Sequence, residues 1–311
     1  MAVSGTVPTE LGDKKIRDLL MQYAVPAIIA MTASSLYNMV DSIFIGHIKD
    51  VGSYAISGLA VTFPLMNIST ALGTLVGVGA STILSMLLGQ RNYQAANKVI
   101  INEVMLNVII GTLYTVITLA FLDPILMFFG ASANTLPYAR DYMVIILIGN
   151  VITHLYFGLN NIIRASGNPK LAMALTIFTV VSNTILDPIF IFWLDMGIKG
   201  AALATVICQL FALVYTIRYF LSGKNYLRLP RRMSEYRLDR RIAKDSLTIG
   251  MGPFLMNSAA CIVTMFINQQ LSKYGGDLAI GAYGIVNRFT FLFIMVNMGL
   301  NQGMQPIAGY N

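Results

Sequence analysis

Long apolar runs dominate the pattern of hydrophobic and polar positions along the chain. A helix that crosses a bilayer needs about 20 mostly apolar residues. Read against that length, the pattern predicts eight spanning helices, over residues 17–46, 55–88, 97–122, 138–163, 170–193, 198–221, 245–271 and 279–308. The sequence does not alternate between apolar and polar residues in the way that the strands of a membrane barrel do. We therefore expect an all-α polytopic membrane protein.

The composition agrees with this interpretation. The chain is 56% hydrophobic and 11% charged, whereas soluble domains contain about 25% charged residues. Its net charge is +7, and about sixteen of the 21 Lys and Arg residues fall on one side of the predicted spans. The positive-inside rule then predicts a multi-pass protein of the inner or plasma membrane with a cytoplasmic N-terminus. No nucleic-acid partner is expected. We interpret the basic stretch 223–243 as a solvated cytoplasmic linker, with contact to anionic lipid as the alternative.

The predicted span 170–193 contains two informative polar residues. Asp187 lies near one end of the span, and Asn183 precedes it by one helical turn, so both share one face. A carboxylate in this place costs about 3 kcal/mol or more unless it has a partner, a proton or an ion. The alternative is an aspartate at a helix end that reaches water.

Three other spans are expected to bring polar side chains to the same depth. At a rise of about 1.5 Å per residue, Asp41, Tyr142, Asp187 and Thr205 all lie roughly 6–12 Å below the outer surface. Hard cations prefer oxygen ligands, and two neighbouring carboxylates hold a proton more tightly than one alone. The sequence therefore predicts a Na⁺ or proton site here, with an outer vestibule of scattered polar groups as the alternative.

The first two predicted spans resemble the last two. The span with Pro26 and Asp41 matches the span with Pro253 and Asn268, at an offset of about 224–227 residues. Six spans separate the copies, so both have the same orientation, as in transporters built from parallel repeats. Because Asn268 replaces the carboxylate, the ion site is expected in the first half only. The predicted division is an N-terminal six-helix lobe at 1–222, the linker at 223–243, and the first two helices of an incomplete second lobe at 244–311.

Several motifs, taken in order, resemble the multidrug and toxic-compound extrusion (MATE) family of secondary transporters. The motifs are residues 37–46, 77–81, 161–170, 183–188, 200–205 and 302–311. The resemblance covers nearly the whole chain. It implies a MATE-like fold, in which twelve helices form two six-helix lobes around a central cavity. This chain would supply the first lobe and the first two helices of the pseudo-symmetric second lobe.

The resemblance also implies roles for particular residues. The expected cation-binding residues, which match the prokaryotic branch related to the DNA-damage-inducible F protein, are Asp41, Asn183, Asp187 and Thr205. Asp41 and Asp187 would bind the metal ion if sodium is the coupling ion. Tyr142 and Asn160 match polar neighbours in the first-lobe cavity, and Pro26 matches the proline where the first helix bends.

Two residues of the first span are added to the expected site because of the chemistry of their side chains. Asn38 is expected in the polar network near Asp41, and Met31 in the wall of the substrate cavity, because methionine adapts to varied ligands. His154 is interpreted as an interior histidine in preference to a proton carrier.

The function expected from these features is antiport by alternating access. Entry of Na⁺ or H⁺ would drive the export of drugs or other organic, often cationic, compounds. A flippase for lipid-linked precursors or oligosaccharides, built on the same superfamily plan, is the alternative. An enzyme is not expected, because the sequence shows no nucleophile–base or metal-binding constellation. We expect no cofactor beyond the coupling ion, and the expected partners are a small organic substrate and the lipid bilayer, with the full-length protein a monomer.

Overall fold

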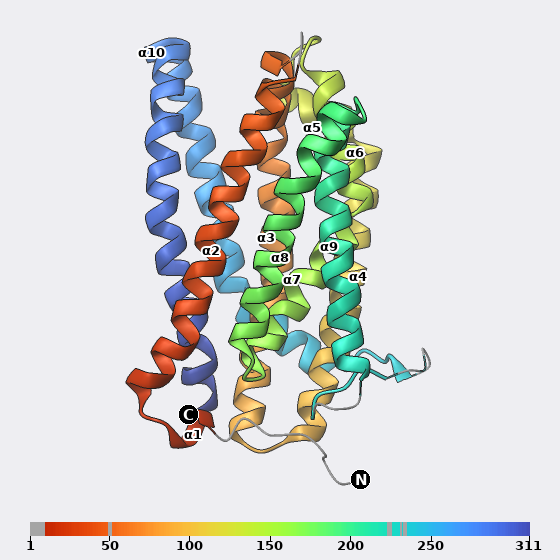
Figure 1. Ribbon diagram of the computed structural model, residues 1–311, viewed down its shortest axis with the longest axis vertical. Coiled ribbons are helices and arrows are strands. Elements are labelled where there is room, and N and C mark those ends of the chain that lie inside the picture. The colour runs from red at the N-terminus through yellow and green to blue at the C-terminus, as the bar shows by residue number, and fades with distance from the viewer. Residues whose placement is uncertain (1–9, 49–51, 223–225, 231, 233–234) are drawn as a thin grey trace.

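The computed structural model describes residues 10–48, 52–222, 226–230, 232 and 235–311. Within its helices, the side chains of residues 38, 53, 264–265, 268–269, 271–273, 275–289 and 291–292 lie outside the description. The elements are helices (Figure 1): α1 (Glu10–Asp13), α2 (Ile16–Gly46), α3 (Gly52–Gly89), α4 (Tyr93–Ala120), α5 (Leu122–Phe128), α6 (Leu136–Ile148), α7 (Asn150–Ala165), α8 (Pro169–Pro188), the π-helix η1 (Ile189–Trp193), α9 (Ile198–Leu221) and α10 (Arg240–Tyr310).

Long apolar helices make up most of the described chain. Six of them are long and apolar enough to cross a membrane, and the pair α6–α7 makes a seventh if it is taken as one bent span. The prediction of an all-helical membrane chain is therefore confirmed. Within the predicted span 279–308, the side chains of residues 279–289 and 291–292 lie outside the description.

The predicted continuous span 138–163 is wrong in one respect, because the chain breaks at Gly149. α6 and α7 meet there at 54°. Gly149 and Asn150 are buried at the break, and α4 supplies hydrogen-bond partners there: Thr115 Oγ1 donates to the Leu147 carbonyl at 3.0 Å, and Asn150 Nδ2 donates to the Gly111 carbonyl at 3.3 Å. Non-helical backbone at membrane depth is tolerated where protein satisfies it in this way.

The predicted span 170–193 matches one candidate span, Pro169–Trp193, which contains two kinds of helix. Regular α-helical geometry ends at Pro188, and η1 continues the chain to Trp193. Proline has no backbone N–H to donate to the preceding turn. A change to the wider π-helical turn therefore begins directly after Asp187 and Pro188.

α10 consists of two antiparallel arms. Near its start, Gly250 lies against the Leu75 backbone of α3, and near its end Gly309 lies against Ser85 of the same helix. A straight helix would place these two glycines about 90 Å apart. The helix must therefore turn back, as Figure 1 shows at the end remote from the chain termini. We call residues 240–263 the first arm and residues 293–310 the second arm.

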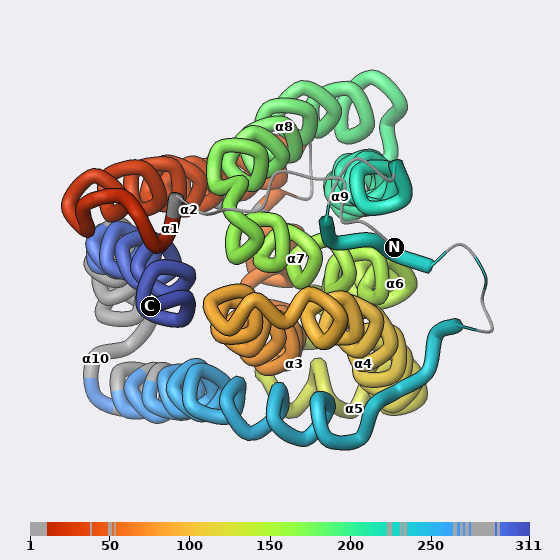
Figure 2. The backbone as a smooth tube through the Cα atoms, turned by 90° about the horizontal axis from the view of Figure 1, so that it is seen from below, coloured from red at the N-terminus to blue at the C-terminus, as the bar shows by residue number. Residues whose placement is uncertain are grey.

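α7 lies at the centre of the bundle when the molecule is viewed along its length. Figure 2 shows α3 and α4 on one side of it and α8 on the other, with α6 and α9 nearby. An apolar core joins these helices through Leu84, Ile100, Ile163 and Phe220, all at most 1% exposed. The buried polar side chains of α7, which are Asn150, His154, Asn160 and Arg164, therefore point into protein.

Glycines allow the two arms of α10 to approach α3 and α2 closely. A Cβ atom on Gly79 would lie 1.9 Å from the Ser246 carbonyl oxygen, and one on Gly250 would lie 1.8 Å from that of Leu75. In the second arm, Cβ atoms on Gly299 and Gly303 would lie 2.6 Å and 2.4 Å from the Cα atoms of Ile28 and Ala24. Small residues spaced four apart are a common basis for helix contact in membranes.

We expect Gly250→Ala to destabilise the protein, because the new methyl group would meet backbone that cannot move aside. Overpacking of this kind costs about 1–3 kcal/mol. The matched control is Gly252→Ala in the same arm, where a Cβ atom meets nothing within 4 Å. Thermal unfolding of the purified variants in detergent would measure the difference. Equal melting temperatures for the two variants would contradict the close approach.

Candidate functional site

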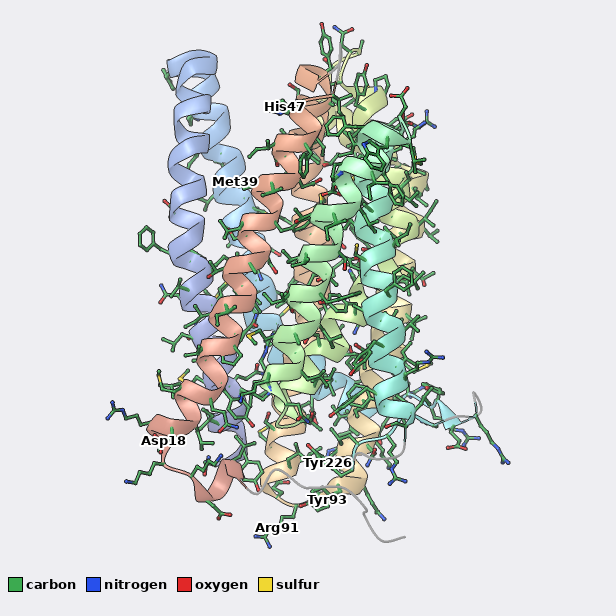
Figure 3. All side chains as sticks on the ribbon, in the orientation of Figure 1. Asp18, Met39, His47, Arg91, Tyr93 and Tyr226 are labelled. Atoms are coloured by element: carbon green, nitrogen blue, oxygen red, sulfur yellow. The ribbon has the colours of Figure 1, made fainter. Side chains whose placement is uncertain are left out.

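Six polar side chains gather near one end of the bundle. We call the end that carries Asp18, Arg91 and Tyr226 the basal end, and the end that carries His47 the distal end (Figure 3). The cluster, here named the distal polar site, lies on the distal side of the bundle and consists of Tyr37 and Asp41 from α2, Tyr142 from α6, Asn183 and Asp187 from α8, and Thr205 from α9.

Helical periodicity explains why α2 and α8 each supply a pair. Tyr37 and Asp41 are four residues apart, as are Asn183 and Asp187, so each pair faces one direction. Hydrogen bonds join the helices: the Tyr37 hydroxyl lies 2.9 Å from Thr205 Oγ1, and Asn183 Nδ2 donates to the same oxygen at 3.3 Å. Thr205 therefore holds α2 and α8 together through its own helix.

The two carboxylates of the site are buried, and three of their four oxygens have no hydrogen-bond partner among the described residues. Asp41 is 6% exposed and Asp187 is 0% exposed. One oxygen of Asp41, both oxygens of Asp187 and the amide oxygen of Asn183 have no partner among the described residues. The carboxylates interact electrostatically with each other, and Tyr142 interacts with both. Asp41, Tyr142 and Asp187, from three different helices, are thus close enough to influence one another.

This arrangement is unfavourable for two unprotonated, unpaired carboxylates. A charged side chain inside a membrane costs about 3 kcal/mol or more, and like charges side by side add to that cost. A hard cation between the carboxylates, or a proton on one of them, would remove the penalty. The described residues contain no cluster of three or more His, Cys, Asp and Glu side chains that could hold a metal. Any metal ion here would need oxygens from Asn183, Thr205 or the tyrosines.

The structure separates other predicted site residues from the carboxylates. Asn160 lies on α7, 4% exposed, and its Nδ2 donates to Thr176 Oγ1 at 3.1 Å. Thr176 precedes Asn183 by seven residues, or about 10 Å along α8. Met31 lies nearer the basal end, where its sulfur lies 3.9 Å from Gln302 Nε2 of the second arm. The side chain of Asn38 lies outside the described residues.

The substrate cavity stays a prediction. One of the hollows among the described residues lies between α3, α4 and α5, is lined mainly by apolar side chains such as Leu65, Ile68 and Phe121, and has a volume of about 560 Å³. Tyr142, Asn160 and Met31 do not line it.

Two residues, the half-buried Tyr37 and the buried Glu103, escaped the sequence analysis as site candidates. Tyr37 belongs to the distal polar site, and its position one turn before Asp41 could have revealed it by the reasoning used for Asn183. Glu103 is a fully buried carboxylate in α4. Its charge interrupts the predicted apolar span 97–122, and that interruption was a usable signal.

Comparison with known proteins identifies the family. The family model described as MatE matches residues 26–189 and 252–311, which together make up more than half of the chain. The chain belongs to the MatE family. The predicted resemblance is therefore confirmed, and MatE proteins are membrane transporters, not enzymes.

Individual relatives agree with this assignment. The chain is 31% identical over 292 residues to the "Multidrug export protein MepA" of Staphylococcus aureus (strain MSSA476), covering 94% of this chain and 64% of that protein. It is 37% identical, with a TM-score of 0.88, to the solved "MATE multidrug transporter DinF-BH", covering 96% and 66% of the two chains. A third structure, "MATE in complex with MaD3S", shares the fold at 24% identity with a TM-score of 0.90, covering 98% of this chain and 68% of that chain. The chain thus spans slightly less than two thirds of the length of the curated MatE relative.

We expect Tyr37→Phe to lower stability, because the variant loses the hydrogen bond between α2 and Thr205. An intramolecular hydrogen bond of this kind contributes about 0.5–1.5 kcal/mol. Tyr54→Phe is the matched control, since Tyr54 is 45% exposed near the distal end of the bundle. Thermal unfolding would compare the two, and a loss of stability in Tyr54→Phe as large as that in Tyr37→Phe would count against the proposed link.

Proposed function

We propose that this MatE chain forms the cation-binding part of an antiporter that exports small organic compounds by alternating access. Its coupling ion is Na⁺ or H⁺, bound in the distal polar site by Asp41, Asn183, Asp187 and Thr205. A single observation carries the proposal: two buried carboxylates from α2 and α8, distant in sequence, interact with each other, and three of their four oxygens lack hydrogen-bond partners among the described residues.

Pro26 is the proposed hinge of α2. It is buried within the helix, between Ala24 and Ile28, the two residues that touch the glycines of the second arm. Binding of a cation neutralises the charge of Asp41 and changes the hydrogen bonds that this side chain forms. Two ligands exchange when each prefers a different state of a shared element. In this mechanism α2 is that element, and its bending expels the substrate.

The proposed orientation places the basal end in the cytoplasm. Basic side chains support it: Arg91 lies at that end (Figure 3), and Lys98 forms an ion pair of 3.9 Å with Asp239 just before α10. The coupling ion would then enter from the distal, outer side. The six-helix lobe at 1–222 and a second lobe that begins at 244 belong to the same proposal.

The substrate class comes from the relatives. MepA is named as a multidrug export protein, and DinF-BH as a multidrug transporter. We propose small organic compounds, often cationic, as the substrates of this protein. These relatives do not favour the flippase alternative.

Asp41→Asn and Asp187→Asn should each abolish drug resistance in cells that express the full-length protein. Each variant keeps the shape of the site but removes a negative charge that the coupling cation needs. Resistance should fall to the level of cells without the gene, while the amount of protein in the membrane stays unchanged.

The matched control for this experiment is Asp123→Asn. Asp123 lies outside the site, in an ion pair of 3.5 Å with Arg140 on the partly exposed distal surface. This variant should keep wild-type resistance. If both site variants also kept it, the proposed cation site would be wrong.

The coupling ion can be identified from thermal stability, because a ligand that binds only the folded state raises the melting temperature. NaCl should raise the melting temperature of the wild type above that in choline chloride, and should not do so in Asp187→Asn. If H⁺ is the coupling ion instead, mild acidification will have this selective effect. The absence of both effects would contradict cation binding at Asp187.

A further inference from the structure

A second buried carboxylate region lies on the basal side of the bundle, away from the distal polar site. Glu103 of α4 is 0% exposed, and one of its oxygens, Oε2, has no hydrogen-bond partner among the described residues. Its other oxygen accepts a hydrogen bond of 2.5 Å from Asn107 Nδ2, one turn further along the same helix. The site proposed for the coupling cation does not include this residue.

The carboxyl group of Glu103 lies against a glycine of the neighbouring helix α7. A Cβ atom on Gly158 of α7 would lie 1.7 Å from Glu103 Oε1 and 2.6 Å from Asn107 Nδ2. Any other residue at position 158 would occupy the space of the carboxyl group. α4 and α7 therefore enclose the carboxyl group between them and hold it in one place.

Further toward the distal end, the same helices hold a histidine. A Cβ atom on Gly111 of α4 would lie 3.4 Å from His154 Nδ1. The other ring nitrogen, Nε2, lies 3.0 Å from Ser69 Oγ, which in turn donates to Asn150 Oδ1 at 2.5 Å. His154 Nδ1 and Asn107 Oδ1 have no partners in the described part of the chain.

These residues lie along the contact between α4 and α7, and Ser69 joins them from α3. We call Ser69, Glu103, Asn107, Asn150 and His154 the basal polar cluster. Its members are buried or half-buried, and three of them carry unpaired atoms. Unpaired buried polar atoms are rare in folded proteins, and each one calls for a ligand or a functional reason.

Among the described residues, no cationic side chain forms an ion pair with Glu103. On α7, Arg164 donates to Asn161 Oδ1 at 3.3 Å and to Gln302 Oε1 of the second arm. On α4, Lys98 pairs with Asp239, which precedes the first arm. Val76 of α3 and Ala243 and Leu247 of the first arm pack with Leu106, which lies one turn after Glu103, and all of them are uncharged. The titratable neighbour on α7 is His154.

We propose that Glu103 binds a proton, and that the basal polar cluster is a second proton-binding site of the protein, separate from the distal polar site. The proton adds to the unpaired carboxylate oxygen and converts the anion to a neutral acid. A neutral carboxyl group with one amide partner fits an enclosed position between two helices, whereas an unpaired anion does not. The inference does not depend on the proposed function, since proton binding can be measured without transport.

The ligand is a proton and not a metal ion because, in the described part of the chain, too few oxygens are recognised as neighbours of Glu103. Sodium would need several oxygen ligands, as hard cations do. Around Glu103 the structure offers the amide nitrogen of Asn107 and the α-carbon of Gly158. A proton requires no such shell of oxygens.

Infrared spectroscopy of the purified chain in lipid nanodiscs can test the proposal. A protonated carboxyl group gives a C=O stretching band that disappears as the pH is raised and the proton leaves. We expect the wild type to show one such band that Glu103→Gln lacks. Bands that depend on Asp41 or Asp187 should persist in Glu103→Gln. The same set of bands in Glu103→Gln and the wild type would overturn the proposal.

Two further measurements keep the test decisive. Asn107→Ala removes the hydrogen bond to Oε1 but keeps the carboxyl group, so the Glu103 band should shift in frequency without disappearing. This variant also serves if Glu103→Gln fails to fold, and an unshifted spectrum would then count against the assignment. Addition of NaCl at constant pH should leave the Glu103 band unchanged. Its loss on addition of sodium would show a metal site and overturn the proton assignment.

Discussion

The need to satisfy polar groups away from water governs this structure. The chain places two aspartates, a glutamate, a histidine and an arginine inside an apolar bundle, where each must find a hydrogen-bond partner, a proton or an ion. Some of these side chains find hydrogen-bond partners within the protein: Arg164 donates to Asn161 and to Gln302 of the second arm. Asp187 differs, because both its oxygens lack hydrogen-bond partners in the described part of the chain. The distinction separates residues that stabilise contacts between helices from residues that can bind a ligand.

The same constraint explains the irregular helices. The bend at Gly149 and the π-helix η1 each interrupt a span at membrane depth, where free backbone groups are costly. Each lies beside buried polar residues: Asn150 begins α7, and Asp187 lies two residues before η1. Side chains and backbone of α4 supply partners at the first of these, through Thr115 and the Gly111 carbonyl. At the bend, irregular backbone is thus covered by a neighbouring helix.

The depth of the residues in the distal polar site could be predicted from the sequence, but the direction in which each side chain faces could not. Depth along a helix follows from residue number alone, so Asp41, Asp187 and Thr205 could be placed at one level. The direction in which a side chain faces depends on helix rotation, and packing sets that rotation. This is why Met31 lies beside Gln302, and why Asn160 faces Thr176, both remote from the carboxylates. The break at Gly149 could not be predicted either, because the mean hydropathy of a stretch of sequence does not change at a bend.

The glycine contacts between α2 and the second arm of α10 have a mechanical consequence. Gly299 and Gly303 bring the second arm against the backbone of α2 on both sides of Pro26, at Ile28 and Ala24. No long side chain lies between the two helices at these glycines that could change rotamer and absorb a displacement. A change in the curvature of α2 must therefore shift the second arm as well. Through the bonds of Gln305 to Val78, Ser81 and Thr82, the same shift reaches α3.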